Sequence, residues 1–179
     1  MIHATSIANA VFRANSFFCA NGISGILAPF RRSRDKGSAM IVKRWEHYPH
    51  QADIGLRGMG ATKAEAFEQA SLALTAAVAD LETIEPSVPF EIVCSAEDDE
   101  ALLAEWLNRL IFEMSTRRML FSRFDLFVGD RRLKARVWGE AIDPGKHQPS
   151  VEVKAVTYCD LAVRQVVDGS WIAQCVVDV

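Results

Sequence analysis

Cysteine is scarce in this 179-residue sequence, and the four residues present are widely spaced. Cys19, Cys94, Cys159 and Cys175 form no C-x-x-C pair, which excludes a zinc knuckle and a C-x-x-C redox motif. A domain of this size needs no disulfides to fold, so we expect reduced thiols and a cytoplasmic setting. Long apolar runs are also missing. None reaches about 18 residues, so we expect no membrane-spanning segment.

The sequence also lacks the short motifs of the common enzyme classes. It contains no Gly-rich P-loop, no G-x-G-x-x-G and no H-E-x-x-H, and no serine lies in a nucleophile elbow. Gly55, Gly58 and Gly60 are close together, but their order matches no phosphate-binding spacing and predicts a turn between a strand and a helix. These absences disfavour an enzyme, and we expect a non-catalytic protein.

Positive charge is scarce in all but the first part of the chain. The net charge is −3, yet residues 1–39 hold five Lys or Arg and one acid, so residues 40–179 hold 15 Lys or Arg against 22 acids. Affinity for phosphates comes largely from Lys and Arg that displace counterions. A body this acidic is not expected to bind RNA by charge alone, so we expect RNA to be reached only through a partner protein.

Residues 1–39 differ in kind from the remainder of the chain. They are rich in small residues and close with the basic cluster Arg31-Arg32-Ser33-Arg34. Transit peptides share this composition, so a targeting peptide is one interpretation. The interpretation we favour is a start codon assigned too far upstream, with Met40 opening the protein. We expect residues 1–39 to be a disordered or wrongly assigned extension, and residues 40–179 to form the domain.

Two helices are predicted from capping residues and apolar spacing. Thr62 and Glu65 form a Thr-x-x-Glu capping box, and Ser95 with Asp98 offers a second capping pair. Each pair is followed by apolar or small residues with the spacing of one buried helical face. The first set is Phe67, Ala70, Leu74, Ala77, Val78 and Leu81, and the second is Leu103, Trp106, Leu107, Leu110 and Met114.

Alternating apolar residues predict strands before, between and after these helices. Gly129-Asp130 and Asp168-Gly169 are predicted two-residue hairpin turns, and residues 143–149 form a longer loop that contains His147. Tight hairpins make paired strands antiparallel. We therefore predict a single α+β domain, with a mostly antiparallel sheet packed by two amphipathic helices that cover one face. The predicted strands are residues 41–48, 54–58, 90–94, 120–128, 132–141, 151–158, 161–167 and 171–179.

Two carboxylates stand at strand boundaries. Asp53 follows His50-Gln51-Ala52, and Asp178 ends an apolar strand one residue before the carboxylate of Val179. Each alone is more typical of a turn or a strand end than of a ligand. A carboxylate at the end of a central strand needs a cation or donors nearby. Two neighbouring carboxylates, with a third from another strand, suit a hard divalent cation such as calcium or magnesium.

Six short blocks form a pattern that runs from about Met40 to the last residue. They are His50-x-Ala52-Asp53-Ile54-Gly55, Trp106-Leu107-Asn108-x-Leu110, Leu120-Phe121-Ser122, Gly139-Glu140-x-Ile142-Asp143, residues 152–158 (EVKAVTY) and Asp178-Val179. No block is decisive alone, but six in order, ending at the last residue, are specific. Together they resemble the archease family.

The resemblance implies a metal site and an accessory function. Archeases bind a divalent metal through the Asp of the His-x-Ala-Asp block and the terminal Asp-Val pair. Carried across, the ligands are Asp53, Asp178 and Val179, the last through backbone or terminal oxygens, and His50 would support the metal from beside it. The family activates a GTP-dependent RNA ligase that splices transfer RNA, promoting guanylylation of the ligase histidine and multiple turnover. The same role, in splicing or RNA repair, is expected here.

Three further residues have open roles. Lys154, between Val153 and Ala155, is a candidate contact for the ligase. His147 matches a position often held by His in the family's loop, although a solvated loop residue is the simpler interpretation. Cys159 stands where the family often has His after Thr-Tyr. If that position touches the metal, a softer thiol would shift the metal preference.

Two other functions remain open at the level of sequence. One is a general chaperone or modulator of RNA-modifying enzymes such as methyltransferases. The other is a metal-dependent hydrolase, in which Asp53 would be a metal ligand and His50 a base. The strand over residues 132–141 also has a basic face, which is either a solvated edge or a contact to the ligase or its RNA. Its cations are Arg132, Lys134 and Arg136.

Overall fold

The computed structural model describes residues 42–179, and the expectations for residues 1–39 and for Met40 lie outside that range. None of the helices in the range is long and apolar enough to cross a membrane. In chain order the elements are β1 (Arg44–His50), β2 (Asp53–Gly60), α1 (Lys63–Val78), the 3-10 turn η1 (Leu81–Thr83), β3 (Val88–Ser95), α2 (Asp99–Arg117), β4 (Met119–Val128), β5 (Arg132–Ala141), α3 (Pro144–His147), β6 (Ala155–Gln165) and β7 (Trp171–Asp178).

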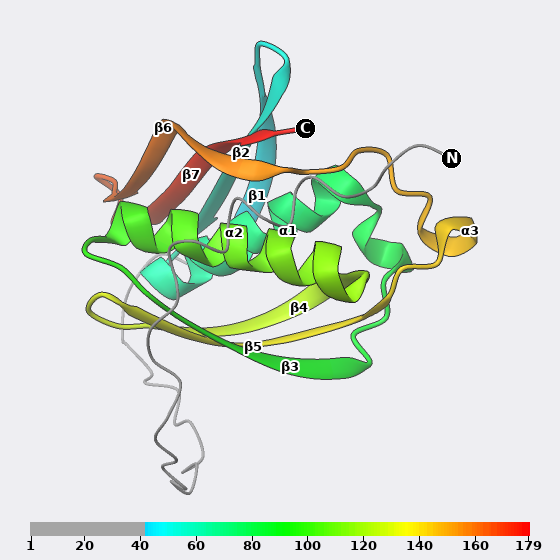
Figure 1. Ribbon diagram of the computed structural model, residues 1–179. Coiled ribbons are helices and arrows are strands. Elements are labelled where there is room, and N and C mark those ends of the chain that lie inside the picture. The colour runs from blue at the N-terminus through cyan, green and yellow to red at the C-terminus, as the bar shows by residue number, and fades with distance from the viewer. Residues whose placement is uncertain (1–41) are drawn as a thin grey trace, which may run out of the picture. The chain divides into compact units, whose positions relative to one another are not determined.

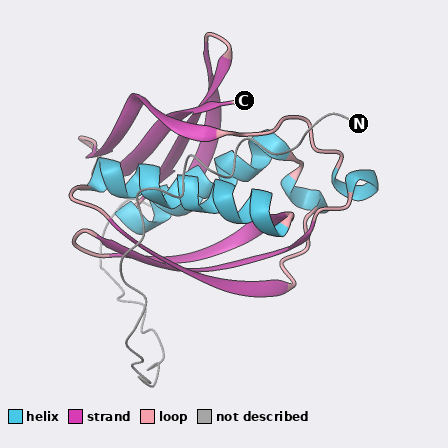
Figure 2. Ribbon diagram, viewed as in Figure 1, coloured by secondary structure: helices cyan, strands magenta, loops and turns pink. Residues whose placement is uncertain are grey.

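The two long helices lie between two antiparallel sheets (Figures 1 and 2). One sheet has four strands in the order β1-β2-β7-β6, and the other has three in the order β3-β5-β4. Both α1 and α2 contact strands of each sheet. The predicted α+β class, with antiparallel strands and two main helices, is confirmed. The helices do not cover one face of a single sheet, because the strands divide into two sheets that share the helical layer.

Both helices begin at residues whose side chains accept backbone hydrogen bonds. The Thr62 hydroxyl accepts from the Glu65 amide (3.1 Å), and the Glu65 carboxylate accepts from the Ala61 amide (2.8 Å). The predicted capping box is therefore confirmed. For α2, Asp98 alone is the N-cap and accepts from the Ala101 amide (2.7 Å). Ser95 is the last residue of β3, so its predicted part in the cap is wrong.

The helical layer supplies most of the core. Trp106 is fully buried on α2, and its indole N–H donates to the Ser71 hydroxyl of α1 (2.8 Å), which satisfies the polar end of a large apolar side chain. Two thiols also face this core, Cys94 from β3 and Cys175 from β7. Burial raises the pKa of each to about 12. They are therefore neutral core groups, as expected for structural thiols.

The hairpin turns are longer than predicted. β4 and β5 are joined by residues 129–131, and the positive φ falls on Arg131 (56°), the last of the three. β6 and β7 are joined by residues 166–170, with Gly169 at a φ of 85°. A left-handed residue at the end of a longer hairpin loop is a common alternative to the two-residue turn. The turn positions were thus predicted correctly, but not the loop lengths.

Two other segments also differ from prediction. In place of the two strands expected at residues 151–158 and 161–167 there is one strand, β6, which begins only at Ala155, ends at Gln165 and shifts its register with β7 between Thr157 and Ala162. Residues at such a register shift are left unpaired, so one strand can include a segment whose sequence resembles a turn. Part of the loop expected at residues 143–149 is the short helix α3, capped by the Asp143 carboxylate, which accepts from the Gly145 amide (2.8 Å).

Candidate functional site

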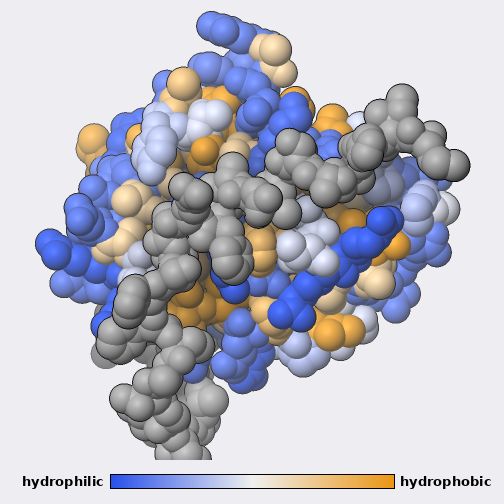
Figure 3. Space-filling view, in the orientation of Figure 1, coloured by the Kyte–Doolittle hydropathy of each residue, from blue (hydrophilic) through white to orange (hydrophobic). Residues whose placement is uncertain are grey.

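The β1–β2 hairpin places His50 opposite Asp53. Its turn is Gln51-Ala52, with Gln51 at a φ of 50°, a conformation that non-glycine residues adopt infrequently. Two residues further along, Gly55 pairs with Tyr48, whose ring lies where a Gly55 side chain would be. This close approach explains why the sequence block has a glycine two residues after Asp53. The tip of the hairpin projects beyond the sheet and carries hydrophilic residues (Figures 1 and 3).

Strand register brings the two candidate carboxylates to the same end of the four-stranded sheet. Ile54 of β2 pairs with Val177 of β7, so Asp53 opens one strand where Asp178 closes its antiparallel neighbour. Figure 1 shows the C-terminus beside the β1–β2 hairpin. The sequence prediction that Asp53, Asp178 and Val179 belong to one locality is therefore supported by topology. We call these three residues and Lys154 the strand-end cluster.

Lys154 brings its positive charge to the C-terminal part of the strand-end cluster, Asp178 and Val179. Its ammonium donates to the Val179 oxygen (2.9 Å) and lies 3.6 Å from Asp178 Oδ1. Its backbone amide also donates to the Asp178 carbonyl (2.9 Å). The side chains of Lys154 and Asp178 are each about half exposed (51% and 49%), so the ion pair is accessible from solvent. Oxygens from two residues thus converge on one cation at the surface.

The donor set of the cluster fits a hard divalent cation. Carboxylate and backbone oxygens are the ligands that calcium and magnesium prefer. Within residues 42–179 no three His, Cys, Asp or Glu side chains gather as a metal site, so a metal here would also need a Val179 oxygen and water. The Nδ1 atom of His50 is buried without a hydrogen-bond partner, next to Asp53 in the pairing. This unsatisfied nitrogen is consistent with a supporting role for His50.

His147 does not belong to this cluster. It lies on α3, at the right-hand edge of Figure 1 and away from the C-terminus. Its side chain is fully buried. Nδ1 accepts from the Asp143 amide (3.0 Å), and Nε2 lies 3.1 Å from Glu140 Oε1. The interpretations as a solvated loop residue and as a partner-facing residue are both wrong, because the ring is buried, with Nδ1 bonded to the N-cap residue of α3 and Nε2 joined to Glu140 of β5.

Glu140 is the charged centre of this second network. The Lys146 ammonium (2.7 Å), the Glu85 amide (2.6 Å) and His147 all contact its carboxylate. These contacts, with the hydrogen bond from Lys146 the largest, lower the pKa of Glu140 to about 2. Glu140 belongs to one of the sequence blocks that carry the resemblance. Its role is structural, because it fastens α3 and the segment before β3 to the three-stranded sheet.

Asn108 and Tyr48 support the cluster and were not predicted as functional residues. The Asn108 side-chain oxygen on α2 accepts from the Val156 amide (2.9 Å), two residues from Lys154 along the chain. The Tyr48 hydroxyl donates to the Cys175 carbonyl (3.4 Å), and burial is the main cause that raises the pKa of Tyr48. Asn108 stands within the apolar run of α2. A polar residue among apolar helical positions was the sequence signal that could have identified it as a functional residue.

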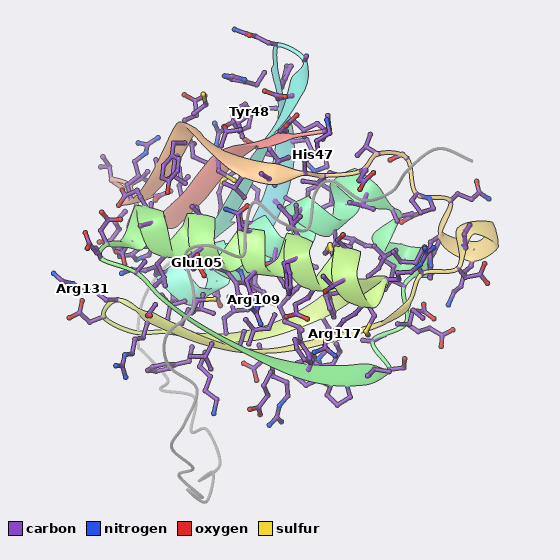
Figure 4. The ribbon with its side chains drawn as sticks, viewed as in Figure 1. His47, Tyr48, Glu105, Arg109, Arg117 and Arg131 are labelled. Atoms are coloured by element: carbon purple, nitrogen blue, oxygen red, sulfur yellow. The ribbon has the colours of Figure 1, made fainter. Side chains whose placement is uncertain are left out.

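Cys159, whose role the sequence left open, and the buried Glu113, which the sequence did not single out, lie apart from the strand end. Cys159 is exposed within the irregular part of β6, whereas the residue of β6 that pairs with Asp178 is Ala155. The thiol is therefore about 13 Å along the strand from that pairing, at about 3.3 Å per residue. The buried Glu113 on α2 is paired with Arg109 (3.0 Å) and Arg117 (2.6 Å), which are labelled in Figure 4.

Fold and site together define a single-domain α+β protein whose four-stranded sheet ends in Asp53, Asp178 and Val179, with Lys154 paired to the last two. The chain belongs to the archease family, because its residues 45–179 match the model of the Archease protein family. It is 39% identical over 142 residues to protein archease of Pyrococcus furiosus, covering 77% of this chain and 100% of that protein. Protein archease of Thermococcus gammatolerans is 41% identical over 141 residues, covering 76% and 99%.

Solved structures agree with the fold. The solution structure of Methanobacterium thermoautotrophicum protein 1598 superposes with a TM-score of 0.63 at 28% identity, covering 75% of this chain and 98% of that one. The crystal structure of an archease, possible chaperone, from Thermotoga maritima superposes with a TM-score of 0.52 at 22% identity, covering 73% and 93%. The second likeness supports the fold alone.

Proposed function

We propose that this protein is an accessory activator of a GTP-dependent RNA ligase, acting in transfer RNA splicing or RNA repair. The observation that carries the proposal is the strand-end cluster, in which two strands bring Asp53 and Asp178 to one exposed edge beside Val179 and Lys154. Family membership favours an accessory protein over an enzyme. The step assisted is guanylylation of the ligase histidine, and the benefit is multiple turnover.

The cluster supplies oxygen ligands for a calcium-like or magnesium-like divalent ion. Asp53, Asp178 and Val179 would hold the ion, and when bound it would stabilise the charge that develops on a transferring phosphoryl group. The Lys154 ammonium contacts the Asp178 and Val179 oxygens of this set and offsets the negative charge there. His50 would support Asp53 from the opposite strand of the hairpin. The exposed position lets the cluster approach the active site of a partner.

The direct test is multiple-turnover ligation with limiting ligase, GTP and RNA whose ends are a phosphate or cyclic phosphate. We expect the full chain to raise the number of turnovers and Asp53→Ala to abolish the rise. Glu97→Ala removes an exposed acid outside the cluster and should activate fully. Full activation by folded Asp53→Ala would show that the protein acts by favouring one ligase conformation rather than through the carboxylates.

A general modulator of RNA-modifying enzymes is the second candidate. The words "possible chaperone" in the description of the Thermotoga maritima structure refer to that protein, and the accessory character of the family leaves this role open. Affinity capture on the full chain separates the two. Recovery of the ligase supports the activator, whereas recovery of an RNA methyltransferase without the ligase supports the modulator. Phosphate release from nucleotides by the isolated protein would instead support the hydrolase considered above.

A further inference from the structure

The three-stranded sheet has an outer face that no described element covers. Its inner side chains pack on the helices, and alternate residues of β4 and β5 point outward. We call this the outer face, defined by Arg123, Phe127, Arg132, Lys134, Arg136 and Trp138. All are exposed except Trp138, which is partly buried. Four of the six are cations. Two exposed acids, Asp125 of β4 and Glu91 of β3, lie on the same face, and both pair in register with Arg136.

The cations stand in a row on the central strand. Arg132, Lys134 and Arg136 alternate along β5, which separates neighbouring charges by about 6.8 Å at about 3.4 Å per residue. Only Arg136 is paired, with Glu91 of β3 (3.0 Å). Within residues 42–179 neither Arg132 nor Lys134 has an ion-pair partner. Arg132 pairs with Ser95, and Lys134 pairs with Val93 and Phe127, so neither cation faces an acid across the sheet. Neighbouring like charges without acids opposite them oppose folding, and a negatively charged partner explains them better than the stability of the sheet does.

Exposed apolar side chains flank this row. Phe127 of β4 and Val93 of β3 pair with Lys134 from its two sides, and they are 58% and 69% exposed. Further along the sheet, the Arg123 guanidinium lies 4.6 Å from the centre of the Trp138 ring. An aromatic ring and an arginine plane are surfaces on which nucleic-acid bases stack. Cations and planar groups therefore lie side by side on one open face of the sheet.

We propose that the outer face binds single-stranded RNA. The basic row would follow the phosphates of an extended strand, and Phe127 and the Arg123–Trp138 pair would stack unpaired bases. A duplex keeps its bases stacked internally and would use the cations alone. An acidic peptide would likewise have no use for the aromatic planes. The choice of RNA over DNA rests on the proposed ligase function, but the binding itself does not.

The outer face and the strand-end cluster lie on opposite sides of the helical layer (Figure 1). Arg131, at the tip of the β4–β5 hairpin, extends the basic surface at one end (Figure 4). One chain can therefore contact the ligase through the four-stranded sheet while it holds RNA on the other sheet. On this proposal RNA is contacted directly as well as through the ligase, by a face that is more basic than the chain as a whole.

Fluorescence anisotropy of a labelled oligouridylate of about 12 nucleotides tests the proposal without any ligase. The full chain should bind in about 50 mM salt, with affinity that falls as salt rises. Lys134→Ala should weaken binding and reduce the slope of log affinity against log salt by about one. Phe127→Ala should weaken binding about tenfold and leave that slope unchanged, because stacking releases no counterions. Unfolding in urea confirms that each variant is folded.

Arg164→Ala is the matched control, since Arg164 is an exposed cation on β6 of the other sheet. It should bind like the native chain. The proposal is overturned if the native chain does not bind the oligonucleotide, or if an RNA duplex or a polyglutamate peptide of equal charge binds as tightly. It is also overturned if Phe127→Ala binds normally. None of these results alters the proposed activation of the ligase, which is measured separately.

Discussion

The two sheets differ in where they present polar chemistry. The four-stranded sheet gathers Asp53, Asp178 and Val179 where its central strands β2 and β7 begin and end. The three-stranded sheet instead carries its charge along the outer face of β5. Both use their inner faces to bury apolar residues on the same two helices. A single core therefore supports two surfaces of opposite charge, and a net charge for the whole chain describes neither.

This difference follows from strand position. A carboxylate in the middle of β7 would be buried, because the residues of that strand before Asp178 are largely enclosed. At the strand end the Asp178 carboxylate is about half exposed and contacts Lys154, which lies just before β6. β5 is central in its sheet, but one of its faces is open, so cations can alternate with buried Leu133, Ala135 and Val137. The strand end suits a small ion, whereas the open face suits an extended ligand.

The largest effect is expected from removing Trp106, a fully buried side chain in the helical layer that packs on Ser71 of α1 and Phe124 of β4. Trp106→Ala should lower the free energy of unfolding by about 3–5 kcal/mol, because it leaves a cavity in the helical layer and removes the donor to the Ser71 hydroxyl, which keeps its own hydrogen bond to the Phe67 carbonyl. Urea unfolding should remain a single transition by circular dichroism and by fluorescence of Trp138 and Trp171, which lie in different sheets. Two separate transitions would contradict the shared core.

A matched pair of glycine substitutions sharpens the comparison. In Gly58→Ala the new methyl group would meet the backbone of α1 at Ala66, and in Gly139→Ala it would meet the Leu120 carbonyl in the next strand. Each should cost about 1–3 kcal/mol in urea unfolding, as expected for overpacking. Only Gly58→Ala changes the strand that carries Asp53, so it should also reduce ligase activation.

Gly129→Ala serves as the control for this pair, because a Cβ there meets mainly the Phe127 side chain, which can move. It should change stability by less than about 0.5 kcal/mol. If Gly58→Ala or Gly139→Ala were equally mild, the close backbone approaches described here would be incorrect. A Gly139→Ala protein that loses ligase activation at normal stability would show that the two sheets are not functionally separate.

The smallest effect is expected from Glu140→Gln, which neutralises the carboxylate that fastens α3 to β5. The folded state lowers the pKa of Glu140 from 4.5 to about 2, chiefly through the hydrogen bond from Lys146. Its stabilising contribution is therefore present above pH 4.5 and lost as the pH falls towards 2. The native chain should lose more stability than Glu140→Gln across that window, measured by urea midpoints. Equal losses would contradict this assignment.

The sequence predicted the local elements better than the long-range pairings. The capping box at Thr62 and the buried stripe around Trp106 depend on neighbours three or four residues away, and the structure confirms both. The pairing of β2 with β7 joins segments more than 100 residues apart, and no local pattern encodes it. This is why one sheet was expected where two exist.

The candidate site was predicted only with the help of the family resemblance. Asp53 and Asp178 look like ordinary turn and strand-end residues, and their proximity depends on the β2–β7 register. His147 was misjudged because sequence places it in a loop with Pro and Gly, while the structure buries it against Glu140. The alternation of cations and apolar residues on β5 was visible in the sequence. Phe127 lies on β4 and belongs to the outer face only because β4 pairs with β5.

The most direct test of the central claim is the rate at which the ligase becomes guanylylated from labelled GTP. The full chain should accelerate this single step, folded Asp53→Ala and Asp178→Ala should not, and Glu97→Ala should act like the native chain. Loss of acceleration in both cluster variants would establish the strand end as the acting surface. Native acceleration by both variants would contradict the account and leave the carboxylates without a role in activation.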